Sequence, residues 1–234
     1  MAELLVKYGA KPTAFVPDDK ELFTEACLRL DREGARRLLQ QHPELLNTTD
    51  AMFAATKKDR VDAVELLLDL GTSPNVEDSK KQRPLHIAGY KDAVRVAQLL
   101  IDRGAEIDMR EANWSNTPLD CAVYYQHPRM IALLSQYSRD VWNLVYVGNV
   151  ERLREIFAAR PDLAKVVWDK WTPLMWLPED EARAVEIVKL FLQHGADPSI
   201  RNKEGLTAAD YARKRALNEA AELLRTSLPP ENST

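Results

Sequence analysis

A two-helix pattern at residues 83–108 recurs along the chain, and this recurrence constrains the fold more than any other feature of the sequence. Pro84 can occupy the first turn of a helix, where its missing N–H is not needed. Apolar residues then recur at helical spacing from Val94 to Ile101 and predict a second helix. Gly104 can take the left-handed conformation that ends such a helix. The segment therefore predicts two helices joined by a tight turn and followed by a polar loop.

The start and end signals of this unit return at a nearly constant period. Pro118 follows Pro84 by 34 residues, and Gly104 follows Gly71 by 33 residues. A single unit cannot cover its own apolar face, so units of this kind stack on one another. We therefore predict an all-α solenoid of stacked helix-turn-helix units, with about seven full repeats and an N-terminal half repeat. The full repeats are expected at residues 19–42, 50–71, 83–104, 117–138, 139–160, 172–195 and 207–226.

The repeated stretches resemble the ankyrin-repeat family, whose pattern is T-P-L-H-x-A-A, then an apolar V/L-L-L run, then G-A-D. Residues 83–89 (RPLHIAG) are similar to the start of this pattern, and residues 192–197 (LQHGAD) are similar to its end. The resemblance covers essentially the whole chain. It implies the solenoid fold and, for His86, structural hydrogen bonds between neighbouring loops. It implies no particular chemistry, because the family shares an architecture rather than an activity.

Three departures from the regular pattern carry further expectations. Only 22 residues separate Ser138 from the matching Arg160, which predicts an almost direct helix-to-helix passage at 137–141 in place of a loop. About two extra residues in 178–181 predict a widened turn between the helices of that repeat. Residues 2–10 have the pattern of a second helix without its first helix. Either the chain was cut from a longer solenoid, which we favour, or a half repeat caps the protein.

The chain is expected to form one domain in a cytoplasmic setting. Residues 1–226 are assigned to a single solenoid domain, and residues 227–234 (SLPPENST) to a disordered tail. The longest apolar runs are too short to span a bilayer, and the N-terminus lacks the pattern of a secretory signal. Cys27 and Cys121 lie 94 residues apart and are expected to be small core residues rather than a disulfide or a metal site.

No arrangement of residues predicts catalysis. The sequence contains no G-x-S-x-G, no phosphate-binding glycine loop and no G-x-G-x-x-G. No two histidines share the i, i+4 spacing of a helical metal site; the four are His42, His86, His127 and His194. We therefore expect no enzyme activity, no cofactor and no metal site.

The expected function lies on the surface of the solenoid. First helices and loops line the concave side of such a stack, which solenoids use for binding. The family resemblance implies contact positions just before each first helix and at its C-terminal end. Large aromatic residues occupy these positions in several repeats. We predict a partner-binding surface comprising Tyr90, Lys91, Trp114, Tyr124, Tyr125, Tyr146, Trp168 and Trp171.

Two interpretations of these aromatic residues remain open. Large aromatic side chains bury much area at low entropic cost and dominate interfaces, which favours a binding surface for the group as a whole. Some of them could instead pack against a neighbouring loop and stiffen it. Trp142 and Trp176 fall at inward positions of their helices, so we expect both in the core.

These features together predict a non-catalytic protein–protein interaction module that binds a polypeptide partner on its concave surface. Residues 179–181 (EDE) place acidic groups at the C-terminal side of the aromatic region. Basic groups lie at its N-terminal side, namely Lys57, Lys58, Lys80, Lys81 and Lys91. The acidic end would repel phosphates, and the formal net charge of −4 also argues against a general polyanion binder. These charged residues are equally well explained as ordinary solvent-exposed residues that keep the protein soluble.

Other functions are kept as alternatives. The chain could be the targeting or substrate-recruiting domain of a larger enzyme or effector whose catalytic part lies outside it. Nucleic-acid binding through the lysines is a weaker alternative, and membrane binding is not expected. A monomer is expected, with self-association through the uncovered N-terminal edge as the alternative.

Overall fold

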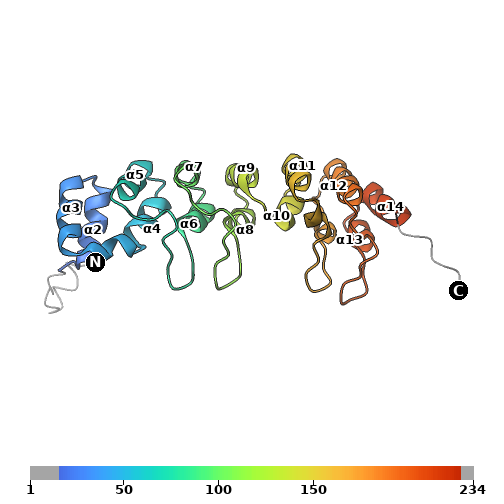
Figure 1. Cartoon of the computed structure of the whole chain (residues 1–234), viewed down its shortest axis with the longest axis horizontal. Helices are drawn as coiled ribbons and strands as arrows, with labels where there is room; N and C mark the ends of the chain where they lie inside the picture. Colours follow the sequence, from blue (N-terminus) through green and yellow to red (C-terminus); the bar gives the residue numbers. More distant parts are fainter. Residues whose placement is uncertain (1–15, 228–234) are drawn as a thin grey trace, which may run out of the picture.

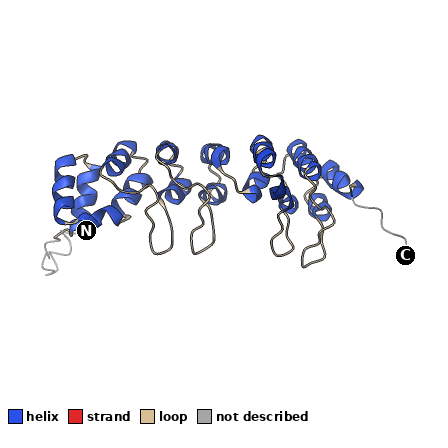
Figure 2. Ribbon diagram, viewed as in Figure 1, coloured by secondary structure: helices blue, strands red, loops and turns tan. Residues whose placement is uncertain are grey.

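A computed structural model, which describes residues 16–227, shows an elongated stack of helix pairs (Figures 1 and 2). The first helices lie in one row and the second helices in a parallel row. The first row contains α2 (Asp19–Leu28), α4 (Asp50–Lys57), α6 (Pro84–Lys91), α8 (Pro118–Tyr124), α10 (Val141–Tyr146), the 3₁₀ turn η3 (Pro173–Trp176) and α13 (Ala208–Lys214). The second row contains α3 (Arg32–Gln41), α5 (Val61–Asp69), α7 (Val94–Asp102), α9 (Pro128–Tyr137), α11 (Val150–Ala159), α12 (Glu181–Gln193) and α14 (Asn218–Thr226).

These seven pairs confirm the predicted all-α solenoid and its seven full repeats within residues 16–227. The 3₁₀ turns η1 (Pro43–Asn47) and η2 (Pro161–Lys165) follow α3 and α11, where the sequence has a proline in place of the closing glycine. The predicted half repeat at residues 2–10 lies outside the described residues, as do residues 228–234 of the tail predicted at 227–234.

Two threonines, Thr117 and Thr207, are helix N-caps at the starts of their repeats, whereas the side chain of Thr172 makes no capping hydrogen bond. The Thr117 hydroxyl accepts a hydrogen bond from the Asp120 N–H (3.1 Å), and the Asp120 carboxylate accepts one from the Thr117 N–H (2.8 Å). Thr207 and Asp210 form the same reciprocal pair before α13. A capping box of this kind satisfies backbone donors that the first turn of a helix leaves without partners. At the opposite end of α7, Gly104 has a φ of +87°, as its predicted role requires.

His86 has the structural role that the family resemblance implies. Its ring is fully buried, with Nε2 2.9 Å from the Met109 carbonyl oxygen and 3.2 Å from the Asn116 carbonyl oxygen. Its Nδ1 lies 3.2 Å from the Arg83 nitrogen. Burial lowers the pKa of His86, against the opposing effect of the two carbonyls. The neutral ring therefore accepts from the Arg83 N–H and donates to the neighbouring loop.

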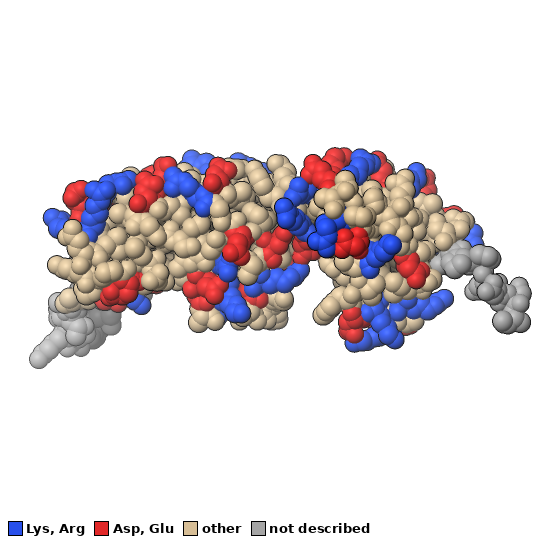
Figure 3. All heavy atoms as spheres, viewed as in Figure 1, with Lys and Arg blue, Asp and Glu red and all other residues tan. Residues whose placement is uncertain are grey.

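The direct passage predicted at 137–141 is confirmed, because α9 ends at Tyr137 and α10 begins at Val141. The connections after α5, α7, α11 and α12 are loops that project from the same side of the stack (Figure 1). The short passage between α9 and α10 leaves a gap in this row of loops. Figure 3 shows that the lower edge of the molecule is indented there.

The repeat at 172–195 lacks the full first helix that is expected of a helix-turn-helix unit. Its first helix is shortened to the single turn η3, and Leu177 leaves the helical region with φ −52° and ψ 152°. Pro178 explains this, because the ring of a proline disfavours the helical conformation of the residue before it. The widened turn lies between η3 and α12, where the extra residues predict it.

The buried apolar side chains form two clusters, one within residues 23–134 and one within residues 141–224. The boundary coincides with the short passage between α9 and α10. Polar groups meet across it: the Asn143 amide donates to the Thr117 hydroxyl (3.0 Å), and the Asn149 amide donates to the Ser135 carbonyl (3.1 Å). The solenoid thus has two apolar cores joined at a polar junction.

Cys27 and Cys121 are buried free thiols, as the sequence predicts, and burial raises the pKa of each to about 12. Within residues 16–227, the structure contains no helix with both the length and the apolar character needed to cross a membrane.

Candidate interaction groove

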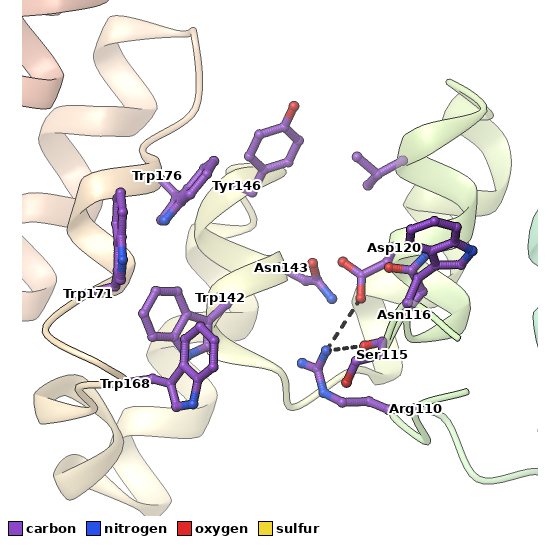
Figure 4. A pocket seen from close by; sticks show the side chains of 12 residues that line it. Arg110, Ser115, Asn116, Asp120, Trp142, Asn143, Tyr146, Trp168, Trp171 and Trp176 are labelled. Atoms are coloured by element: carbon purple, nitrogen blue, oxygen red, sulfur yellow. Dashed lines mark hydrogen bonds and ion pairs between the residues drawn. The ribbon is translucent and has the colours of Figure 1, made fainter. Parts of the chain in front are cut away.

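A groove of about 910 Å³ lies beside the gap in the row of loops (Figure 4). All five tryptophans of the chain line it, although they are spread from residue 114 to residue 176. We call this site the tryptophan groove. Its aromatic lining is Trp114, Trp142, Tyr146, Trp168, Trp171 and Trp176, and its polar lining includes Arg110, Ser115, Asn116, Asp120 and Asn143.

A tight turn positions two of the indoles. The Trp168 N–H donates to the Trp171 carbonyl (3.0 Å), and the Trp171 N–H donates to the Trp168 carbonyl (2.8 Å). The two residues between them, Asp169 and Lys170, have φ values of 48° and 69°, as in the tight turns of hairpins. Residues that exchange both hydrogen bonds lie directly opposite each other, so their side chains point to the same side. The turn therefore presents both indoles to the groove.

The tryptophans that line the groove differ in how tightly they are packed. The Trp171 ring lies 5.7 Å from the Trp176 ring and 5.5 Å from the Tyr211 ring, centroid to centroid, which holds it half-buried. Trp168 is 72% exposed, and Trp176 is 45% exposed. Trp142 and Tyr146 are one helical turn apart on α10, so both can face the groove.

The loop after α7 supplies the opposite wall. The Glu111 carboxylate accepts hydrogen bonds from the backbone N–H groups of Asn113 (2.7 Å), Trp114 (2.7 Å) and Asn116 (3.3 Å). Burial by itself would raise the pKa of Glu111, but these hydrogen bonds lower it overall. Glu111 thereby fixes the loop that carries Trp114, and this residue is 78% exposed.

The charged groups of this wall are linked to one another. Arg110 donates to the Ser115 carbonyl (2.7 Å), pairs with Asp140, and lies 3.7 Å from the Asp120 carboxylate. Asp140 also caps α10, since its carboxylate accepts from the Trp142 N–H (3.0 Å). Burial raises the pKa of Asp140, and the Arg110 guanidinium opposes this rise. Arg110 therefore connects the loop after α7 with the start of α10.

The eight predicted contact residues divide between two places. Trp114, Tyr146, Trp168 and Trp171 all line the tryptophan groove. The remaining four lie around the ends of α6 and α8 and do not line the groove, namely Tyr90, Lys91, Tyr124 and Tyr125. The structure thus brings the two loop segments together with α10, as one surface, and leaves the α6–α8 residues as a second one.

The second surface is a tyrosine cluster. Tyr125 meets Tyr90 edge-on at 5.6 Å and Tyr124 at 5.1 Å, and it stacks on His127 at 6.0 Å between ring centroids. Tyr90 is half-buried, and burial raises the pKa of its phenol. Tyr124 is 77% exposed, and Lys91 is exposed as well. Tyr90 therefore also supports the interpretation in which an aromatic residue stiffens its surroundings.

The prediction that Trp142 and Trp176 are core residues was wrong for Trp176, which is exposed, and holds only in part for Trp142, which is half-buried; both line the groove. The missing loop leaves Trp142 without a cover. Trp176 ends a shortened 3₁₀ turn rather than a full helix, so its helical register does not apply. Two sequence signals could have predicted that Trp142 and Trp176 line a surface groove. One is the short spacing of the repeat that ends at Arg160, and the other is that all five tryptophans lie within residues 114–176.

The described part of the chain also lacks a metal-binding cluster. Residues 16–227 contain no group of three or more His, Cys, Asp or Glu side chains arranged to hold a metal ion. The histidine with the most buried ring, His86, is used in loop contacts. What the groove offers is therefore a set of exposed indole faces opposite a linked set of charges.

Comparisons with known proteins agree with this architecture. The family model of ankyrin repeats in three copies matches residues 23–111 and 51–144, and the model of a single ankyrin repeat matches residues 169–203. The ankyrin repeat protein YahD of Escherichia coli K12 is 26% identical over 190 residues, which cover 75% of this chain and 94% of that protein. The potassium channel GORK of Arabidopsis thaliana is 28% identical over 129 residues, which cover 51% of this chain and 16% of the channel.

Among solved structures, the ankyrin repeat domain of Bcl-3 superposes with a TM-score of 0.57 and 18% sequence identity. The match covers 87% of this chain and 97% of that domain. A likeness at this level of identity shows the fold alone.

Proposed function

Because the chain belongs to the ankyrin-repeat family, whose repeats are generally protein–protein interaction modules, we propose that it is a non-catalytic module that binds a polypeptide partner. The partner is proposed to lie on the concave face that the first helices and the loops form. One observation supports this proposal: all five tryptophans of the chain line a single groove formed by first helices and loops.

The physical argument is the cost of leaving these residues exposed. Trp114 and Trp168 expose 78% and 72% of their surface and come to the groove from two different loops, after α7 and after α11. Indoles contribute a large apolar area with few rotatable bonds, so burying them against a partner is favourable at a low entropic cost. Interface hot spots are enriched in Trp and Tyr for this reason. The groove is therefore the best candidate for the centre of an interface.

Affinity capture from a lysate of the source organism tests the proposal. The double variant Trp114→Ser, Trp168→Ser removes the two most exposed indoles, and Tyr124→Ser removes an equally exposed aromatic residue outside the groove. We expect a partner that wild type and Tyr124→Ser retain and the double variant loses. Melting temperatures close to that of wild type verify that both variants are folded. Equal capture by all three proteins would contradict the groove as the binding site, and loss with Tyr124→Ser alone would assign binding to the tyrosine cluster.

The proposed state is a cytoplasmic monomer whose residues 1–226 form one domain. Two buried free thiols support a reducing compartment, since disulfides form and persist where the surroundings are oxidising. Sedimentation equilibrium should give the chain mass of 26.6 kDa at all concentrations. A mass that rises with concentration would instead favour self-association.

A second candidate is a recruiting module within a larger protein. The observation that favours it is the match to the GORK channel, which spans 51% of this chain and only 16% of the channel. Immunoblotting of the source organism distinguishes the two. A band well above 26.6 kDa supports the larger protein, and a band at that mass contradicts it.

A further inference from the structure

We propose that the tryptophan groove recognises an arginine side chain on an extended segment of the partner. Its guanidinium lies against the indole faces and pairs with Asp120. This inference rests on the proposed function and adds to it the chemistry of the segment that the groove accepts. Figure 4 shows the arrangement behind it: the Asp120 carboxylate and Arg110 face the groove from one side, and Trp142, Trp168, Trp171 and Trp176 lie on the other.

Arg110, which carries the positive charge of the groove lining, already has partners within the protein. Arg110 pairs with Asp140, donates to the Ser115 carbonyl at 2.7 Å, and lies 3.7 Å from Asp120. An acidic side chain entering the groove would therefore compete with Asp140 for Arg110 while being repelled by Asp120. One guanidinium faces two carboxylates here, so the wall is complementary to a cation rather than to an anion.

Asp120 keeps an open acceptor. Its Oδ2 accepts both hydrogen bonds from Thr117, from the N–H at 2.8 Å and from the hydroxyl at 3.0 Å. Its Oδ1 accepts no hydrogen bond from any of the described residues, and the side chain is 29% exposed. A purely apolar segment would remove water from this oxygen without replacing its hydrogen bonds, which is unfavourable. A segment that brings an N–H donor avoids that penalty.

The aromatic wall selects among donors. A cation over an aromatic face is attracted by the ring quadrupole, and indole is the best face of this kind. Arginine has a planar guanidinium that stacks on indoles and forms forked hydrogen bonds with a carboxylate, whereas the ammonium of lysine is a strongly hydrated point charge. The groove therefore favours arginine over lysine.

The remaining charges near the aromatic wall do not reverse this argument. Asp169 is paired with Lys203 at 2.5 Å. Lys170 lies at the tip of the turn between Trp168 and Trp171 and is not part of the groove lining. Arg110 and Asp120 are thus the charged side chains among the lining residues.

Selection from a random dodecapeptide library displayed on phage tests the inference. The library is selected in parallel on wild type, on the Trp114→Ser, Trp168→Ser variant and on Asp120→Asn. Asparagine keeps an acceptor oxygen for Thr117, so this change is expected to leave the cap of α8 in place, and its melting temperature verifies this. We expect peptides that need the tryptophans and are enriched in arginine, and we expect the arginine enrichment to disappear on Asp120→Asn.

A matched pair of peptides then measures the role of the charge. In the tightest-binding peptide, the arginine is replaced by citrulline, which keeps the planar shape without the positive charge. We expect citrulline to weaken binding to wild type about tenfold or more, and Asp120→Asn to weaken the arginine peptide by a similar factor. Asp120→Asn should leave the affinity of the citrulline peptide unchanged within about twofold.

The outcomes separate this inference from the proposed function. Tryptophan-dependent peptides without arginine enrichment, or equal affinities for arginine and citrulline, overturn the inference and leave the proposed function standing. Arginine enrichment that persists on Asp120→Asn overturns the role of Asp120. If wild type selects no peptide that depends on the tryptophans, the groove fails as a polypeptide site, and the inference fails with it.

Discussion

Removal of the Phe157 ring is expected to destabilise one half of the solenoid and spare the other. Phe157 is fully buried in the C-terminal cluster, and its ring meets the Phe191 ring edge-on at 4.9 Å between centroids. Phe157→Ala removes this packing and leaves a cavity, which lowers the free energy of unfolding by about 3–5 kcal/mol. Because the apolar cores are separate, the loss should fall on residues 141–224.

Native-state hydrogen exchange measures this difference, because amides exchange through local openings whose free energies vary along the chain. A loss of about 3–5 kcal/mol accelerates exchange by roughly two to four powers of ten in α11 and α12. Amides of α5 and α7 should change by less than about threefold, since repeats contact only their neighbours. Leu100→Ala, at a fully buried position of the N-terminal cluster, is the matched control and should give the opposite pattern. Equal acceleration in both halves by either variant would refute the division into two cores.

Three further predictions concern the junction, a helix end and pH. Asn143→Ala removes the 3.0 Å hydrogen bond to Thr117 and should lower the free energy of unfolding by about 1–3 kcal/mol in urea titrations; an unchanged midpoint would show that this bond does not hold the junction. Gly104→Ala puts a Cβ into open space at φ +87°, so only backbone strain applies, and thermal unfolding should show a loss of about 1–2 kcal/mol; a gain in stability would contradict the left-handed helix end. The pKa of His86 is lower in the folded protein than in the unfolded chain, so His86 is protonated in the unfolded chain first as pH falls. The stability that comes from keeping the His86 ring neutral is therefore fully present above pH 6.5 and is lost as pH falls through the pKa of the folded protein. Urea titrations at a series of pH values below 6.5 should show this decline in wild type and a flatter profile in His86→Asn, and parallel profiles would argue against it.

Much of the fold could be predicted because its signals are local. A proline at a helix start, a capping threonine and a closing glycine act within one turn, as the Thr117 cap and the left-handed Gly104 illustrate. The period of the repeat then determines which units stack, because each must cover the apolar face of the next. The short passage at 137–141 was predictable for the same reason, since it is a difference in length along one chain.

The groove was predicted only in part, because it depends on what the missing loop uncovers. Trp114 and Trp168 lie in loops and were expected on the surface, whereas Trp142 and Trp176 lie at positions that a regular repeat would bury. Repeat periodicity describes the neighbours that a residue should have, and it does not show which neighbours are removed when one loop is absent. The effect of Pro178 on the preceding turn is local, but the exposure of Trp176 that accompanies it depends on the packing around η3.

Fluorine NMR of the protein labelled with 5-fluorotryptophan measures partner binding at the groove without any substitution. Each of the five tryptophans lines the groove, so every labelled indole reports on this one site. When a polypeptide captured by the wild-type protein is added to saturation, the resonances of Trp114, Trp168 and Trp171 should shift or broaden. A polypeptide that binds in calorimetry and leaves all five resonances unchanged would contradict the assignment of the groove as the interaction site.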